Sequence, residues 1–300
     1  ASLLGESNVD YHDLIFQTAL SSDNNISLTG NVNDALPYRA SLGYTTQEGT
    51  LIGSTYDRAT LDLSVAPSLL DKHLTLNLNG KGLYSYSNYS DGGVVGNAAF
   101  FNPTQDPYFR NADGSIDYTT CNGFWNYGGG RGDQFTQSTL VGVSPLSQLY
   151  DKVSNGRAYR FIGNANIDYK VHGLEELKFV LSLGMDYSWG RNYNGVNPGS
   201  FQAAGDNENP RIGQYSISNS VSRNEVLEAY ANYNKDFGIH NLDVMAGYSW
   251  QHVYNGGQSI SYFNETDEVK LNPGESIDTR YPYGASESYL VSFYSRVNYS

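Results

Sequence analysis

Apolar and polar side chains alternate at every second residue over stretches much longer than the strands of most soluble proteins. The clearest stretch, residues 177–189, has an apolar residue at every odd position and, apart from Val180, a polar residue or glycine at every even one. Successive side chains of a strand point to opposite faces, so this pattern predicts a strand with one apolar and one polar face. A helix would scatter the same residues around its circumference. The chain is therefore restricted to a fold made of long two-faced strands. The apolar positions are Leu177, Phe179, Leu181, Leu183, Met185, Tyr187 and Trp189.

The alternation recurs along the chain and predicts nine strands. Most of them span 13–15 residues, whereas strands of soluble proteins typically have about 5–6. A tilted strand that crosses a membrane needs about 9–11. Strand length therefore favours a membrane barrel over a soluble sandwich. We expect the strands at 25–32, 38–47, 54–66, 73–87, 157–171, 176–190, 222–235, 240–254 and 287–300.

The connections between these strands alternate between short and long. The short ones fall at 33–37, 67–72, 172–175 and 236–239, and the others at 48–53, 88–156, 191–221 and 255–286. Short periplasmic turns and long extracellular loops on opposite sides are typical of outer-membrane barrels. We therefore expect the segment 88–156 to be a long extracellular loop.

Aromatic residues of the apolar face gather at the long-loop ends of their strands. From Tyr159 to Tyr169, near the short-turn end, is ten residues. This corresponds to roughly 33 Å of strand, or roughly 25 Å of height at a tilt of about 40°, which matches the apolar band between two aromatic girdles. The alternative is that tyrosine is simply a good strand former. The predicted membrane-interface aromatics are Tyr84, Tyr86, Tyr159, Phe161, Tyr187, Trp189, Tyr248, Trp250 and Tyr289.

The opposite face carries Thr, Asn, Ser, Asp, Lys and Arg. In a soluble sheet the apolar face would need a covering layer, but no amphipathic helix is evident. Lipid outside and water or a polar plug inside would satisfy both faces. We therefore predict an all-β fold: a segment of an antiparallel up-and-down transmembrane β-barrel, with about nine long strands. We expect these residues to form an open, curved sheet.

Composition excludes several other classes. The net charge of −13 argues against nucleic acid, whose phosphates select basic surfaces. The single cysteine, Cys121, has no partner for an internal disulfide. The chain has no signal peptide at its start and ends within an alternating stretch. We therefore expect an interior piece of a longer barrel chain.

Several segments resemble the SusC/RagA family of TonB-linked outer-membrane transporters, and they follow the family's order over most of the chain. They are DLIFQTALSSDNNISLTG at 13–30, PYRASLGYTTQEGTL at 37–51, YDRATLDLSVAPSLLDKHLTLNLNGKG at 56–82, NPTQDPYFRNADGSID at 102–117 and RFIGNANIDYKVHGLEELKFVLSLGMDYSWG at 160–190. Each alone is an ordinary strand or loop sequence, and their serial order is what is specific.

The resemblance implies a large plugged barrel in the bacterial outer membrane. Family members import oligosaccharides, or peptides in some cases, with a SusD-like surface lipoprotein as a lid and energy from the TonB–ExbB–ExbD complex. Residues 1–300 would be a partial barrel domain, without the family's plug, N-terminal extension and C-terminal strands. TonB dependence is thus inferred from the resemblance alone.

No catalytic constellation is evident, because the chain lacks the H-E-x-x-H, G-x-S-x-G and P-loop motifs. We expect neither an enzyme nor a cofactor. No pair among the five histidines has metal-ligand spacing on one element, and His172 and His240 should lie in solvent at short turns. Three short motifs in the long loop have ordinary interpretations: a flexible loop for 128–130, a chance match for the Arg-Gly-Asp tripeptide at 131–133, and an Asp-Gly turn for 111–114.

The segment 88–156 also carries aromatic residues outside any lipid-facing pattern. They could pack on one another over the barrel mouth, dock a partner such as the lid, or stack on sugar rings. The candidates for ligand or lid contact are Trp125, Tyr127, Phe124, Tyr108 and Phe109, and the remaining aromatics include Phe100 and Phe101.

The function that these observations favour is import of oligosaccharides or peptides across the outer membrane, with outer-membrane lipid around the barrel. One alternative is a surface receptor or adhesin barrel without transport. Another is a soluble carbohydrate-active β-protein, which the aromatic girdle disfavours.

Overall fold

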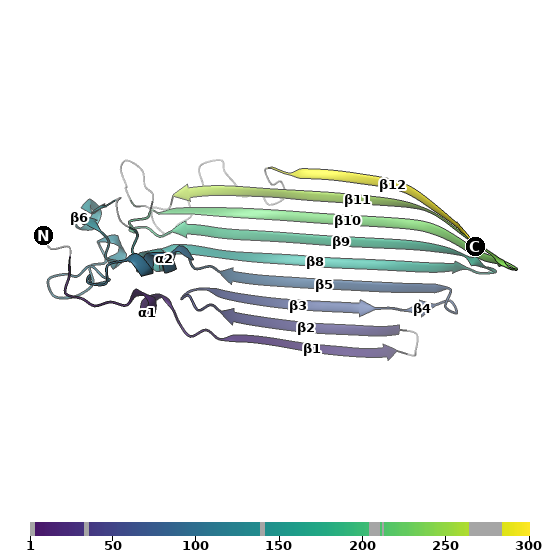
Figure 1. Ribbon diagram of the computed structural model, residues 1–300, viewed down its shortest axis with the longest axis horizontal. Helices are drawn as coiled ribbons and strands as arrows, with labels where there is room; N and C mark the ends of the chain where they lie inside the picture. The colour runs from purple at the N-terminus through teal and green to yellow at the C-terminus, as the bar shows by residue number, and fades with distance from the viewer. Residues whose placement is uncertain (1–3, 33–35, 139–141, 204–210, 212, 264–283) are drawn as a thin grey trace.

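The chain forms one large antiparallel sheet whose strands follow one another in sequence order (Figure 1). The computed structural model describes residues 4–32, 36–138, 142–203, 211, 213–263 and 284–300. Within them the sheet has the order β1-β2-β3-β5-β8-β9-β10-β11-β12, and the two-residue β4 pairs with β5. β1 and β12 form the two edges, and the sheet is open and curved, which confirms the predicted fold class.

All nine predicted long strands are present. Their bounds are Ser21–Val32 (β1), Leu36–Glu48 (β2), Thr55–Val65 (β3), Leu74–Asn88 (β5), Lys152–Val171 (β8), Leu174–Val196 (β9), Gln214–Phe237 (β10), His240–Phe263 (β11) and Ser286–Tyr299 (β12). The expected short turn at 33–37 lies partly, and the expected long loop at 255–286 largely, outside the described residues.

Four strands extend further towards the long connections than the alternation predicts. β8 begins at Lys152, β9 ends at Val196, β10 begins at Gln214 and β11 ends at Phe263. The predicted bounds were wrong there because the extensions are rich in Ser, Asn and Gly, and apolar residues alternate over only part of them, as at Tyr215, Ile217 and Val221. Backbone pairing continues regardless of side-chain pattern, since each N–H and C=O finds its partner on the next strand.

The polar face of the sheet is joined by hydrogen bonds and ion pairs between neighbouring strands. Arg160 pairs with Asp186 at 2.6 Å and Lys178 with Asp168 at 2.7 Å. Further along the sheet, the Tyr294 hydroxyl donates to Glu228 Oε1 at 2.5 Å. Glu228 lies two strands away, and Gly247 on the strand between them leaves room, since a Cβ there would meet the Tyr294 ring at 2.4 Å.

The apolar face has no protein layer over most of the described strands, and large side chains on it remain exposed. They extend from one edge of the sheet to the other: Ile26, Leu28, Leu42, Leu61, Leu63, Leu78, Phe179, Leu183, Met185, Val291, Phe293 and Val297. A monomer in water rarely leaves so continuous an apolar surface open. This face therefore requires a nonaqueous neighbour.

Three short helices gather at the long-connection end of the sheet (Figure 1), although the sequence shows no amphipathic helix: Tyr11–Ile15 (α1), Gly93–Phe100 (α2) and Pro145–Tyr150 (α3). They are too short for a helical period to be recognised, and local caps stabilise two of them. Asp10 accepts a hydrogen bond from the His12 amide before α1, and Ser144 accepts one from the Ser147 amide before α3. Within the described residues no helix is long and apolar enough to cross a membrane.

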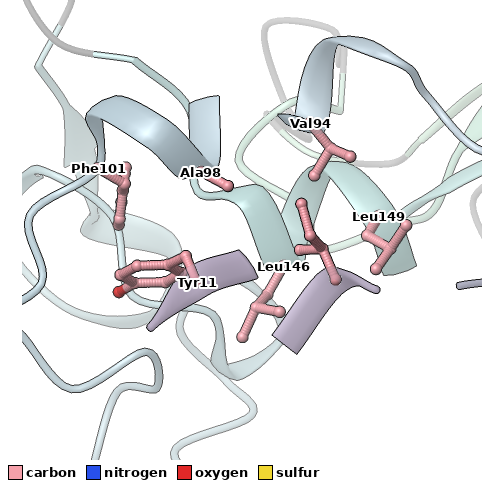
Figure 2. Close-up of a cluster of buried hydrophobic side chains, with 7 residues drawn as sticks. Tyr11, Val94, Ala98, Phe101, Leu146 and Leu149 are labelled. Atoms are coloured by element: carbon pink, nitrogen blue, oxygen red, sulfur yellow. The ribbon is translucent and has the colours of Figure 1, made fainter. Parts of the chain in front are cut away.

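A hydrophobic core joins these helices, and we call the helices with the loops around them the cap. Tyr11 and Ile15 from α1, Val94 and Ala98 from α2, Phe101 after it, and Leu146 and Leu149 from α3 are buried together. Figure 2 shows these side chains converging from the three helices. The segment 89–151 is thus a packed structure rather than an open loop.

Replacing Val94, which is 0% exposed, tests whether this core holds the cap. Val94→Ala removes two methyl groups and leaves a cavity, so we expect local stability to fall by about 2 kcal/mol. Amide hydrogen exchange in 89–151 of the full-length protein should accelerate, while exchange in β8 and β9 stays unchanged. The control is Val95→Ala on the same helix, where the side chain is 37% exposed and exchange should barely change. Equal acceleration in both variants would contradict the account.

Candidate functional site

Three of the predicted contact aromatics are packed inside the cap. Phe109 is 6% exposed and packs edge-on against Phe135 at 5.4 Å between ring centroids. Trp125 and Tyr127 are partly buried, 4.7 Å from each other, and both contact Phe101. These are the contacts expected if the aromatic residues of this segment pack on one another.

Tyr108 and Phe124 lie differently, because they form an aromatic row that reaches the surface. Tyr108 contacts Phe124 at 5.9 Å, and Phe124 stacks on Tyr150 at 5.9 Å with an interplanar angle of 9°. Tyr150, at the end of α3, is 48% exposed. Sequence reasoning missed Tyr150 because nothing in the pattern shows that it continues a row begun 42 residues earlier at Tyr108.

A charged network fixes the loop that carries Phe109. The Asp117 carboxylate accepts hydrogen bonds from the hydroxyls of Thr119 and Thr120 and from Arg131, and these lower its pKa to about 2. The ionised carboxylate therefore stabilises the cap at neutral pH, and this contribution is lost as the pH falls from 3.8 towards 2. Arg131 also lies over the Phe109 ring at 4.9 Å. The arginine of the Arg-Gly-Asp tripeptide is thus engaged within the cap, which favours a chance match.

Cys121 and Asp151 are buried beside this network. Burial raises the pKa of the Cys121 thiol to about 11, so the thiol is protonated and a poor nucleophile at neutral pH. Burial also raises the pKa of Asp151, which accepts hydrogen bonds from Ser147 Oγ at 2.5 Å and Asn122 Nδ2 at 2.9 Å. Asp151 thus ties α3 to the loop that carries Asn122.

Two short motifs of the cap are ordinary turns. Asp113 accepts hydrogen bonds from the amide and hydroxyl of Ser115, and Gly114 has a φ of +85°, which glycine adopts freely. The glycines at 128–130 do not form the expected flexible loop. Gly128 and Gly129 pair with Thr136 and Gln137 in a small hairpin, where a Cβ on Gly128 would meet the Thr136 carbonyl oxygen at 2.3 Å.

The predicted membrane-interface aromatics lie on the apolar face and contact one another across strands. Tyr84, Tyr159 and Trp189 are register partners, with ring centroids 4.9 and 5.4 Å apart. Phe161 and Tyr187 are also register partners, two residues along their strands towards the short turns. Tyr86 lies two residues beyond Tyr84 towards the cap. Towards the other edge, Tyr248 contacts Phe293 at 5.3 Å and Trp250 contacts Tyr289 at 6.4 Å. The aromatics therefore cross the sheet as an oblique band, as tilted strands require.

Three histidines at the short-turn end of the sheet contact residues that are distant from them in the sequence. His172 is exposed as expected, but its ring stacks on that of His73 at 3.8 Å, and His73 Nε2 lies 3.3 Å from Glu175. His240 is also exposed, and its Nδ1 lies 2.7 Å from the Tyr299 hydroxyl. No group of three or more metal-ligating side chains occurs in the part of the chain that the structure describes.

A cleft of about 430 Å³ lies between the cap and the ends of β8, β9 and β10. Its lining combines the aromatic rings of Tyr89 and Tyr215 with the amide of Asn194 and the Asp91–Lys152 ion pair. Such a lining can hold a ligand that has flat apolar faces and hydrogen-bonding edges. Sequence reasoning missed it, because its residues come from five separate segments without a shared motif.

Known proteins resemble this chain in sequence and in fold. No family model matches the chain. The chain is 32% identical over 309 residues to the TonB-dependent receptor SusC of Bacteroides thetaiotaomicron, which covers 99% of the chain and 29% of the receptor. It is 26% identical over 317 residues to the TonB-dependent receptor P3 of Formosa agariphila, covering 98% of the chain and 28% of that protein.

A similar fold occurs in the RagAB peptide importer in its closed-closed state. The TM-score is 0.66 at 17% identity, and the match covers 99% of this chain and 32% of that one. The chain therefore spans less than a third of the length of the proteins it matches. Sequence and fold agree over this stretch, and the chain belongs to the SusC/RagA family of TonB-dependent receptors.

Proposed function

We propose that the sheet is part of the barrel wall of an outer-membrane active transporter that imports oligosaccharides or peptides. In this proposal a SusD-like surface lipoprotein serves as the lid, and TonB with ExbB and ExbD supplies energy through a plug region of the parent protein. The chain has no catalytic role. The relatives named above are two TonB-dependent receptors and a peptide importer, which supports transport as the activity of the whole protein.

The observation that carries the proposal is the opposite character of the two faces. On strands β1 to β12 most of the exposed large apolar side chains lie on one face, with Val226 and Leu290 as exceptions, while the other face is joined by ion pairs such as Arg160–Asp186. Lipid satisfies the first face and a water-filled or plugged lumen satisfies the second. The band of Tyr84, Tyr159 and Trp189 then marks the level of the membrane–water interface on the cap side of the sheet.

This orientation places the cap on the extracellular side. The turns at the opposite end are short, with only His172 and Gly173 between β8 and β9 and only Gly238 and Ile239 between β10 and β11. Short turns face the periplasm in outer-membrane barrels. We infer that the cap covers part of the extracellular mouth, where a lid would dock.

The row Tyr108–Phe124–Tyr150 is the part of the cap that we propose for lid contact. It reaches the surface at Tyr150, and aromatic rings of this kind are common anchors of protein interfaces. Trp125, Tyr127 and Phe109 are packed inside the cap, and ligand stacking by them would need the cap to open. The Tyr89–Tyr215 cleft is the alternative place for a ligand.

A surface receptor or adhesin barrel without transport would share the same two-faced wall and the same cap. The first test is therefore a tagged pull-down of the intact parent protein, extracted in detergent from its native outer membrane, with partners identified by mass spectrometry. A co-purifying surface lipoprotein supports the lidded importer. An outer-membrane protein that arrives alone favours the receptor or adhesin, and recovery in the soluble fraction contradicts the barrel.

An arginine introduced on the apolar face tests the lipid contact. Leu183 lies in the middle of that face, between Ala165 and Leu227, and is 39% exposed. We expect Leu183→Arg to destabilise the full-length protein in lipid vesicles by about 2–4 kcal/mol, because the charge would enter hydrocarbon. Its neighbour Ser182 faces Glu228, so the control Ser182→Arg should cost much less. Similar losses in denaturant titrations of both variants would refute the assignment of the faces.

Removing the exposed end of the aromatic row tests lid docking. Tyr150→Ala should lower the amount of co-purified lipoprotein at least several-fold, because truncation of a central aromatic anchor typically costs about 2 kcal/mol or more of binding. Phe237→Ala is the matched control, since Phe237 is 51% exposed at the short-turn end of β10. Unchanged recovery in Tyr150→Ala, with normal expression, would exclude this row as the docking site.

A further inference from the structure

Two arginines lie side by side on the lipid-facing side of the sheet, just beyond the aromatic band. Arg157 of β8 and Arg191 of β9 are register partners, so their side chains leave the same face. Residues directly opposite in an antiparallel pair have Cβ atoms about 4.5–5.5 Å apart, and like charges at this position are destabilising. Both side chains are exposed, and neither has a carboxylate partner among the described residues. The pair therefore has positive charge that nothing described in the protein offsets.

The residues directly beside the pair are uncharged. In the same row, Tyr86 lies beside Arg157 and Asn219 beside Arg191. The row nearer the cap contains Asn155 and Tyr193, which are again register partners. Two outward-facing carboxylates of nearby strands have partners of their own: Asp57 accepts from the Tyr44 hydroxyl at 3.3 Å, and Glu225 lies 2.9 Å from His252 and 3.7 Å from Arg223.

The row on the other side of the pair is the aromatic band itself. Tyr159 and Trp189 are register partners in this band. They lie two residues along each strand from the arginines, a distance of about 7 Å. Below it the exposed side chains of Phe161, Tyr187 and Met185 continue the apolar face. Arg157 also lies over the Tyr86 ring at 6.0 Å, which orients its guanidinium. A complementary ligand has an anionic head and a hydrocarbon body that extends down the sheet.

We propose that Arg157 and Arg191 together bind the phosphate group of an anionic lipid in the outer leaflet of the membrane. Each guanidinium presents a planar fork that can donate two hydrogen bonds to phosphate oxygens. A phosphate between them offsets both charges, and its acyl chains lie against Phe161 and Tyr187. β8 and β9 stay paired beyond the aromatic band, and this pairing fixes the distance between the backbones of the two arginines. This inference rests on the proposed lipid-facing orientation of the sheet.

The experiment uses the full-length protein purified in detergent and exchanged with dioleoyl phosphatidic acid and dioleoyl phosphatidylcholine in equal amounts. Native mass spectrometry then gives the ratio of the two lipids that stay bound. We expect the wild type to prefer phosphatidic acid, and the double variant Arg157→Gln/Arg191→Gln to lose about tenfold or more of this preference. The variant Arg157→Lys/Arg191→Lys keeps the charges without the planar forks and should lie between the two.

Arg39→Gln is the matched control. Arg39 is an exposed arginine on the polar face, where it donates to Ser41 Oγ at 3.4 Å, and its replacement removes one positive charge from the opposite side of the sheet. The lipid ratio should stay unchanged in this variant. An equal loss there would mean that net charge alone sets the preference, and the site would be refuted.

Two further outcomes separate the inference from the proposed function. If the double variant binds phosphatidic acid as the wild type does, or if millimolar inorganic phosphate displaces the lipid, the lipid-phosphate site is wrong while the lipid-facing sheet stands. If the wild type retains neither lipid, the lipid-facing orientation itself fails, and the inference falls with it.

Discussion

The uninterrupted hydrogen-bonded ladder between neighbouring long strands is the constraint on which the rest of the structure depends. A backbone N–H or C=O left without a partner in hydrocarbon costs several kcal/mol, so strands can cross a membrane only when each is paired along its length. The ladder runs without a change of order from β1 to β12. It fixes which side chains share a row and a face. The aromatic band, the polar network and the arginine pair all follow from that register.

The cap depends on a different interaction, the burial of side chains from three short helices. Ile15, Val94 and Leu146 come from segments far apart in sequence, and together they form a core that the sheet does not provide. Asp151 and Asn122 then tie this core to the loop that follows β9, through the Asn122 hydrogen bond to Pro198 O. A surface built in this way can keep Tyr150 exposed at a fixed position, which a flexible loop could not do.

Sequence reasoning predicted the sheet well, because a period of two records the environment on both faces directly: Leu177 to Trp189 on one side and Lys178 to Ser188 on the other. It failed beyond the aromatic band, since β9 continues to Val196 through residues that need not alternate once both faces are polar. It also failed in the cap, where α2 is only eight residues long and the partners of Val94 include Ile15, 79 residues before it, and Leu146, 52 residues after it. Stacked pairs such as His73 and His172 depend on tertiary register, which spacing along the chain does not encode.

The central claim is that one face of the sheet contacts lipid and the other contacts water or a plug. The most direct measurement places a nitroxide at each position from 177 to 189 of the full-length protein in lipid bilayers and compares its collisions with oxygen and with a water-soluble nickel chelate. We predict that odd positions, such as Leu183, collide mainly with oxygen, and that even positions, such as Ser182, are shielded from it. A ratio that does not alternate with a period of two would contradict the account.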